Sequence, residues 1–290
     1  MPLPLLIGGA ILLAGVGVKK GYDATELNDK AERIVNRAKS DHYDANERLE
    51  LKQEETNTRL ETLGEFKIKI FTTDIHYLVE AIKRCKDSAN SEYLSKKIFT
   101  EQELNELNNS VNNSLEIQKG LASGAAAGAL TGLGAYGAVG ALASASTGTA
   151  IAGLSGAAAT NATLAWLGVG GFVMNSAAEE NLTQAREYEE DVDIKIEEMN
   201  KTKSILKSIR GRASEVEDAI LEISNRFNQL VVNIEQTRRK ESDFCKSEDM
   251  NKLIVMGKAL KNLLDIPVLD ENGKENIRVT SEINQAITLE

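Results

Sequence analysis

The chain has 290 residues, a formal net charge of −10, three prolines and an aromatic content of only 4%. The acidic balance excludes nucleic acid as an expected partner, because no basic stripe is present to neutralise phosphates. Few aromatic residues and few prolines favour long helices over a large globular core. We therefore expect an all-α protein.

The N-terminus begins with an apolar run. The first 18 residues carry no charged side chain and are followed by Lys19 and Lys20. A run of this length barely spans a bilayer, and Leu, Ile and Val cover every face of it. We predict an apolar membrane helix over residues 1–20, with a buried or interfacial helix as the alternative. If the run spans, the lysine pair and all that follows lie in the cytoplasm.

Residues 21–119 are charged and are predicted to form coiled-coil helices. Their best apolar seam alternates steps of three and four residues, as heptad packing requires. The seam is Ile68, Phe71, Ile75, Leu78 and Ile82. Thr100 followed by Glu103 forms a capping box, which predicts that another helix begins there.

Residues 120–178 contain no charged side chain, and we predict a Gly/Ala-rich membrane hairpin there. The length suffices for two membrane crossings joined by a turn. A helical hairpin buried inside a bundle is the alternative. Glycine and alanine add little insertion energy but let helices approach closely. The predicted helix-packing positions are Gly120, Gly124, Gly128, Gly132, Gly148 and Gly156.

Residues 132–137 within this stretch match the pattern GxGxxG. A nucleotide-binding loop requires a strand before the first glycine and a helix after the last. A helical pattern precedes the glycines here, so we expect no nucleotide site. No GK[ST] sequence occurs, which excludes a P-loop.

Residues 179–240 carry the most regular heptad pattern and predict one long coiled-coil helix. Such a pattern demands a partner helix. The partner is either the helix of residues 23–82, lying antiparallel, or another copy of the chain. The seam residues are Leu206, Ile209, Val216, Ile220, Ile223, Phe227, Leu230 and Ile234.

Residues 241–290 are predicted to form a C-terminal helical cap. One helix follows Ser247 and ends before Pro267, which cannot continue a helix. A turn at residues 270–273 and a short helix from Ser281 complete the segment.

The cysteines and histidines show no pattern of a reactive site. Cys85 and Cys245 lie far apart and imply no disulfide framework, and isolated reduced thiols suit a cytosolic environment. His42 and His76 have no partner at a metal-ligand spacing. We find no catalytic constellation. We therefore predict that the protein is not an enzyme and needs no cofactor or metal.

Three segments are distinctive when taken together. They are LLIGGAILLAGVGVKKGYDA, STGTAIAGLSGAAATNATLAWLG and ALKNLLDIPVLDENGK. Together they resemble a widespread bacterial family of glycine-zipper membrane proteins, some of which are described by similarity as chemotaxis proteins. The resemblance covers nearly the whole chain, and its central motif is specific but carries no established activity. It implies a bacterial membrane setting.

These patterns predict a non-enzymatic protein of the bacterial inner membrane with its coiled coil in the cytoplasm. It self-associates through the glycine-zipper hairpin, in a structural or signalling role. The expected partners are the lipid bilayer and further copies of the chain, and any other protein partner is left open. The alternative is a pore-forming or membrane-inserting protein resembling helical cytolysins. The N-terminal apolar run favours the first, since a secreted toxin needs no permanent anchor.

Overall fold

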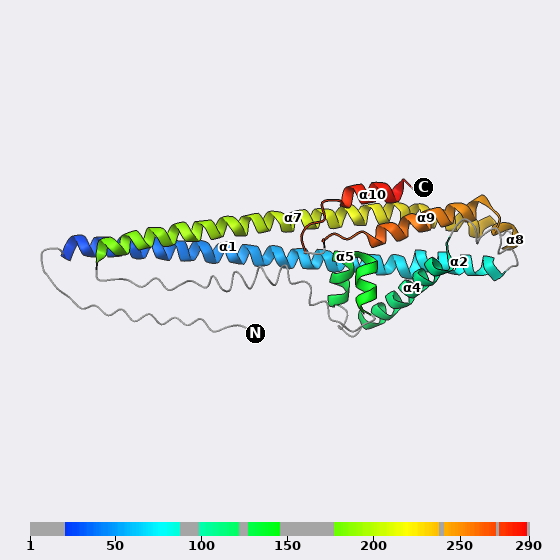
Figure 1. Ribbon diagram of the computed structural model, residues 1–290, viewed down its shortest axis with the longest axis horizontal. Coiled ribbons are helices and arrows are strands. Elements are labelled where there is room, and N and C mark those ends of the chain that lie inside the picture. Colours follow the sequence, from blue (N-terminus) through cyan, green and yellow to red (C-terminus); the bar gives the residue numbers. More distant parts are fainter. Residues whose placement is uncertain are drawn as a thin grey trace. The chain divides into compact units, whose positions relative to one another are not determined.

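The computed structural model is all-α over the residues it describes, which confirms the predicted fold class (Figure 1). Those residues include one isolated antiparallel bridge, between Leu269 and Glu275, but no strand. The described residues are 21–87, 99–121, 127–145, 177–237, 241–270 and 273–288.

The described residues divide into two compact units. Unit 1 contains those within residues 1–46 and 169–199, and unit 2 contains those within 47–168 and 200–290. The boundaries after residues 46 and 199 fall inside long helices rather than at changes of composition. The sequence did not indicate them, because the charged helical pattern is continuous across both.

Two long helices contribute to both units, α1 (Gly21–Ile70) and α7 (Ala178–Thr237). In unit 1 they pack through a small apolar cluster. Its members are Ala31, Ile34, Val35, Leu182, Ala185 and Tyr188. The Asn181 side chain is buried and donates to Asn28 Oδ1 at 2.9 Å. A buried asparagine that is hydrogen-bonded across two helices specifies their register at a cost in stability.

In unit 2, α1 and α7 lie side by side and run in the same direction (Figure 1). Side-chain contacts in order along the pair join Lys52 to Arg210, Arg59 to Ser214 and Asp74 to Ser224. Since residue numbers rise together on both helices, the pair is parallel, and the predicted antiparallel arrangement is wrong. Residues 88–177 separate the two helical runs, and a connection of this length allows parallel neighbours where a short turn would not.

The first helical run extends beyond α1 without a break. A π-helical turn, η1 (Phe71–Ile75), leads into α2 (His76–Asp87). Both η1 and α2 pack against α4 (Glu101–Leu121). The Thr100 amide donates to the Glu103 carboxylate at 2.7 Å, and the Glu103 amide donates to Thr100 Oγ1 at 3.1 Å. These reciprocal bonds confirm the predicted capping box.

The C-terminal elements follow the predicted order. After the single turn α8 (Glu241–Phe244), Ser247 caps α9 (Glu248–Asp265) by accepting from the Met250 amide at 3.3 Å. The helix ends before Pro267, as the sequence predicts. The last helix, α10 (Val279–Ile287), packs against α9 and begins two residues before the predicted Ser281.

Both predicted apolar seams contribute to one large cluster in unit 2. Every seam residue from Ile68 to Ile82 is buried. On α7 the buried seam residues are Ile209, Val216, Ile220, Ile223 and Phe227, and the half-buried ones are Leu206, Leu230 and Ile234. Helices of the same chain therefore cover the centre of the α7 seam.

The described part of the predicted hairpin packs inside unit 2. It forms α5 (Ala127–Ala145), whose helical backbone breaks at Gly137, where φ is 75°. A Cβ atom at Gly134 would collide with the Leu60 carbonyl, and one at Gly64 would collide with the Leu130 carbonyl. The backbones of α1 and α5 therefore touch, as the alternative of a buried hairpin predicts for this part of the stretch.

The structure contradicts the predicted membrane helices. Among the described residues, none of the helices combines the length and the apolar composition needed to cross a membrane. The predicted transmembrane helices and inner-membrane location are therefore wrong by this finding. The apolar run of residues 1–20 and the second arm of the predicted hairpin lie outside the described residues.

The two cysteines form a disulfide, contrary to the prediction of isolated thiols. Their Cα atoms lie 5.4 Å apart although the residues are 160 positions apart in sequence. Cys85 is on α2, Cys245 directly follows α8, and both are buried. The sequence favoured a cytosolic environment because the two thiols were expected to be reduced. A disulfide removes that reason, since disulfides persist in oxidising compartments.

The close α1–α5 contact predicts opposite effects of alanine at two glycines of α5. Gly134→Ala should lower the free energy of unfolding by about 3 kcal/mol, because the new methyl group meets the Leu60 carbonyl. Gly128→Ala should raise it by about 0.5–1 kcal/mol, since Gly128 is exposed and a Cβ there has no neighbour within 4 Å. Urea denaturation followed by circular dichroism measures both. Equal changes in the free energy of unfolding for the two variants would contradict the contact between α1 and α5.

The disulfide predicts a large loss of stability on its removal. Replacing Cys85 and Cys245 together by alanine should lower the free energy of unfolding by about 2–5 kcal/mol, because the bond closes a long loop. Guanidinium unfolding measures the loss. Alkylation of the denatured but unreduced protein tests the bond itself, and modification of both thiols in that state would disprove it.

Candidate functional site: a groove on α1 and α7

A groove with a volume of about 670 Å³ lies on the α1–α7 pair of unit 2. Its lining residues are Arg48, Leu51, Lys52, Glu54, Glu55, Thr58 and Lys203. Steps of three and four residues place most of the α1 members on one helix face. The groove is therefore mainly a surface of α1, with Lys203 contributed by α7.

Leu51 is the apolar centre of the groove, and 53% of it is exposed. A single exposed leucine needs no explanation. Here, however, the groove contains Arg48, Leu51, Lys52 and Glu55, which have the spacing i, i+3, i+4 and i+7. Four residues with this spacing form the hole that receives one side chain of a facing helix.

Charges of both signs surround the groove. Glu55 is engaged within the chain, with its carboxylate 2.6 Å from Lys52 Nζ and 3.2 Å from the Arg210 guanidinium. The hydrogen bond from Lys52 is the main reason why the pKa of Glu55 lies below its ordinary value. Arg48 and Glu54 have no ion pair or side-chain hydrogen bond within the part of the chain that the structure describes.

A buried lysine marks a second polar site, in the core of unit 2. The side chain of Lys67 is fully buried, and its Nζ donates to the carbonyls of Ile266 at 3.1 Å and Leu133 at 3.4 Å. Ile266 is the C-cap of α9, and Leu133 lies one turn before the break in α5. A cation is favourable at the carbonyl end of a helix. Lys67 therefore joins α1 to the ends of two other helical segments.

The charge state of Lys67 is set mainly by burial. Burial lowers the pKa of Lys67 to about 7, and the negative charge of Asp265 opposes this shift only in part. Asp265 itself lies 3.0 Å from Lys261. The same junction has a backbone contact, since the Ala135 carbonyl accepts from the amides of Val268 and Leu269 at 2.8 and 2.9 Å.

A third polar site is centred on Asp74, which is buried at the π-helical turn. It accepts from Ser224 Oγ at 2.5 Å, from Asn228 Nδ2 at 3.3 Å and from Thr73 Oγ1 at 2.9 Å. These bonds pair α7 with η1 in one register. Neither Asp74 nor Lys67 is among the site residues that the sequence predicted. A signal existed for Asp74, because it lies three residues after the seam position Phe71, whereas Lys67 precedes the seam.

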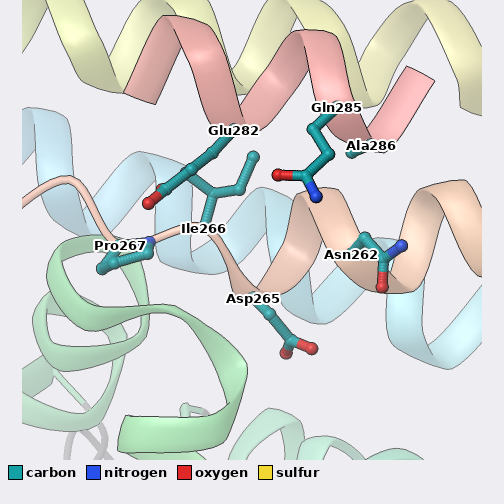
Figure 2. Close-up of a pocket in the computed structure, with 7 residues that line it drawn as sticks. All are labelled: Asn262, Asp265, Ile266, Pro267, Glu282, Gln285 and Ala286. Atoms are coloured by element: carbon teal, nitrogen blue, oxygen red, sulfur yellow. The ribbon is translucent and has the colours of Figure 1, made fainter. Parts of the chain in front are cut away.

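A pocket of about 380 Å³ lies between the end of α9 and α10 (Figure 2). Its polar side chains are Asn262, Asp265, Glu282 and Gln285. Both carboxylates already have cationic neighbours, Lys261 at 3.0 Å from Asp265 and Arg278 at 3.7 Å from Glu282. Figure 2 shows the Asp265 carboxylate pointing away from α10. The pocket therefore offers no pair of free carboxylates for chemistry.

Of the six predicted helix-packing glycines, the three that the structure describes differ in burial. Gly120 is half-buried in α4, Gly132 is buried in α5, and Gly128 is exposed on α5. The other predicted positions, Gly124, Gly148 and Gly156, lie outside the described residues. A Cβ atom added at Gly128 would have no neighbour within 4 Å among the described residues. A role for it between copies of the chain stays a prediction.

The described residues contain no group of three or more His, Cys, Asp or Glu side chains placed to hold a metal ion. No family model, curated protein or solved structure matches the chain. The resemblance to glycine-zipper membrane proteins therefore stays a prediction. The fold itself defines an all-α protein built on long parallel helices.

The buried lysine predicts a pH dependence of stability. Between the folded pKa of about 7 and the ordinary value of 10.5, the unfolded chain binds a proton that the folded chain lacks. The free energy of unfolding should therefore rise with pH, by about 2–3 kcal/mol from about pH 7 to about pH 9. Below pH 7 both states carry the charge, and this gain is absent.

Lys67→Met should remove this rise, because methionine does not titrate, whereas Lys69→Met at an exposed position should keep it. Urea denaturation at both pH values measures the difference. Parallel pH profiles for the wild type and Lys67→Met would rule out the assignment.

Proposed function

We propose that the protein is a non-enzymatic helical protein that acts by associating with a second copy of itself, in a structural or signalling role. The groove on α1 and α7 carries this proposal. It presents an exposed Leu51 within a four-residue hole, beside charges of both signs. A surface that has both a projecting side chain and a hole to receive one is suited to an identical surface.

The buried polar residues favour a structural use of this fold. Lys67 binds two backbone carbonyls, and Asp74 accepts from two side chains of α7. Buried polar groups of this kind must be hydrogen-bonded, and pairing them across helices makes the packing specific. Lys67 and Asp74 are thus used to hold helices together.

The proposal keeps the self-association expected from the sequence but assigns it to a different surface. The sequence favoured the glycines of the uncharged stretch. In the described part of that stretch, Gly134 packs against α1 of the same chain, whereas Leu51 is exposed. The predicted lipid partner is not part of the proposal.

Sedimentation velocity of the purified full chain tests the proposal. The 31.5 kDa chain should give a species of twice that mass, and its share should grow with loading concentration by mass action. A single species of monomer mass at every concentration would contradict self-association.

A further inference from the structure

We propose that the second copy docks antiparallel on the groove, with its own Leu51 seated between Arg48, Leu51, Lys52 and Glu55 of the first copy. This inference rests on the proposed self-association and names the contact that produces it. The contact is isologous, so each copy supplies one leucine and one hole.

The order of charges around Leu51 favours the antiparallel direction. With a two-fold axis at Leu51, a residue before Leu51 on one copy lies level with a residue equally far after Leu51 on the other. Arg48 stands three positions before Leu51, and Glu54 and Glu55 stand three and four positions after it. At a rise of about 1.5 Å per residue, Arg48 lies level with the partner's Glu54. Symmetry repeats this pairing, which gives the interface two attractive contacts of opposite charge.

The parallel direction lacks this complementarity. It would set Arg48 beside the partner's Arg48, and like charges facing each other across an interface are repulsive. The antiparallel contact has one unfavourable feature, because Glu47, four positions before Leu51, lies level with the partner's Glu55. Glu55 already has ion pairs with Lys52 and Arg210 of its own chain, which weaken that repulsion.

Arg48 and Glu54 are available for this contact. Both are exposed, and neither has an ion pair or side-chain hydrogen bond among the described residues. The groove as a whole carries three basic and two acidic side chains, so it does not repeat the strongly acidic balance of the chain. A near-balanced surface can meet its own copy without the repulsion that a net charge of −10 otherwise produces.

Charge reversal with rescue tests the geometry on the full chain. By sedimentation velocity, Arg48→Glu and Leu51→Glu should each raise the dimer dissociation constant about tenfold or more. The double variant Arg48→Glu with Glu54→Arg should return it to within about threefold of the wild type, because the opposite charges are restored. Leu221→Glu, at an exposed leucine of α7 away from the groove, is the matched control and should leave it unchanged.

The outcomes separate the two proposals. A wild-type dimer that Arg48→Glu and Leu51→Glu leave intact would overturn this contact while self-association stands. A double variant no tighter than Arg48→Glu alone would overturn the antiparallel pairing. A monomeric wild type would overturn both. All substituted positions are exposed, and circular dichroism confirms that each variant keeps its helical fold.

Discussion

The parallel pairing of α1 and α7 in unit 2 is the constraint on which the rest of that unit depends. Apolar seams alone would allow the pair to slide by a heptad, because each repeat resembles the next. The buried carboxylate of Asp74 removes that freedom. In its observed register it accepts from Ser224 and Asn228, whereas a slide by seven residues would replace both donors by an apolar and an acidic side chain, which cannot donate, at a large cost in free energy.

The parallel direction leaves a long connection between the two helical runs, and its described part completes the core. Within that connection, α5 meets α1 where Gly134 and Gly64 allow the backbones to touch. The amine of Lys67, on the same helix α1, donates to the carbonyl of Leu133 in α5 and to that of Ile266 at the end of α9. The α1–α5 contact and the Lys67 site are therefore one junction, and a change at either affects the other.

The interior and the surface of unit 2 use polar residues differently. In the core, Lys67 and Asp74 each have hydrogen-bond partners within the chain, and these bonds hold neighbouring helices together. On the α1 face, Arg48 and Glu54 are exposed beside Leu51. A second copy of the chain would give all three a partner. This contrast supports the proposed association through α1.

Local patterns in the sequence determined the helices, because periodicity and capping depend on residues within one or two turns. The Thr100 capping box, the Ser247 cap and the stop before Pro267 are of this kind. Only the tertiary structure decided the direction of α7, the disulfide and the burial of Lys67, since each depends on residues far apart in the chain. The same reason explains why the prediction of transmembrane helices was wrong. An apolar helix has the same composition whether lipid or protein covers it. For α5, the packing of Gly134 against α1 shows that protein covers this part of the helix.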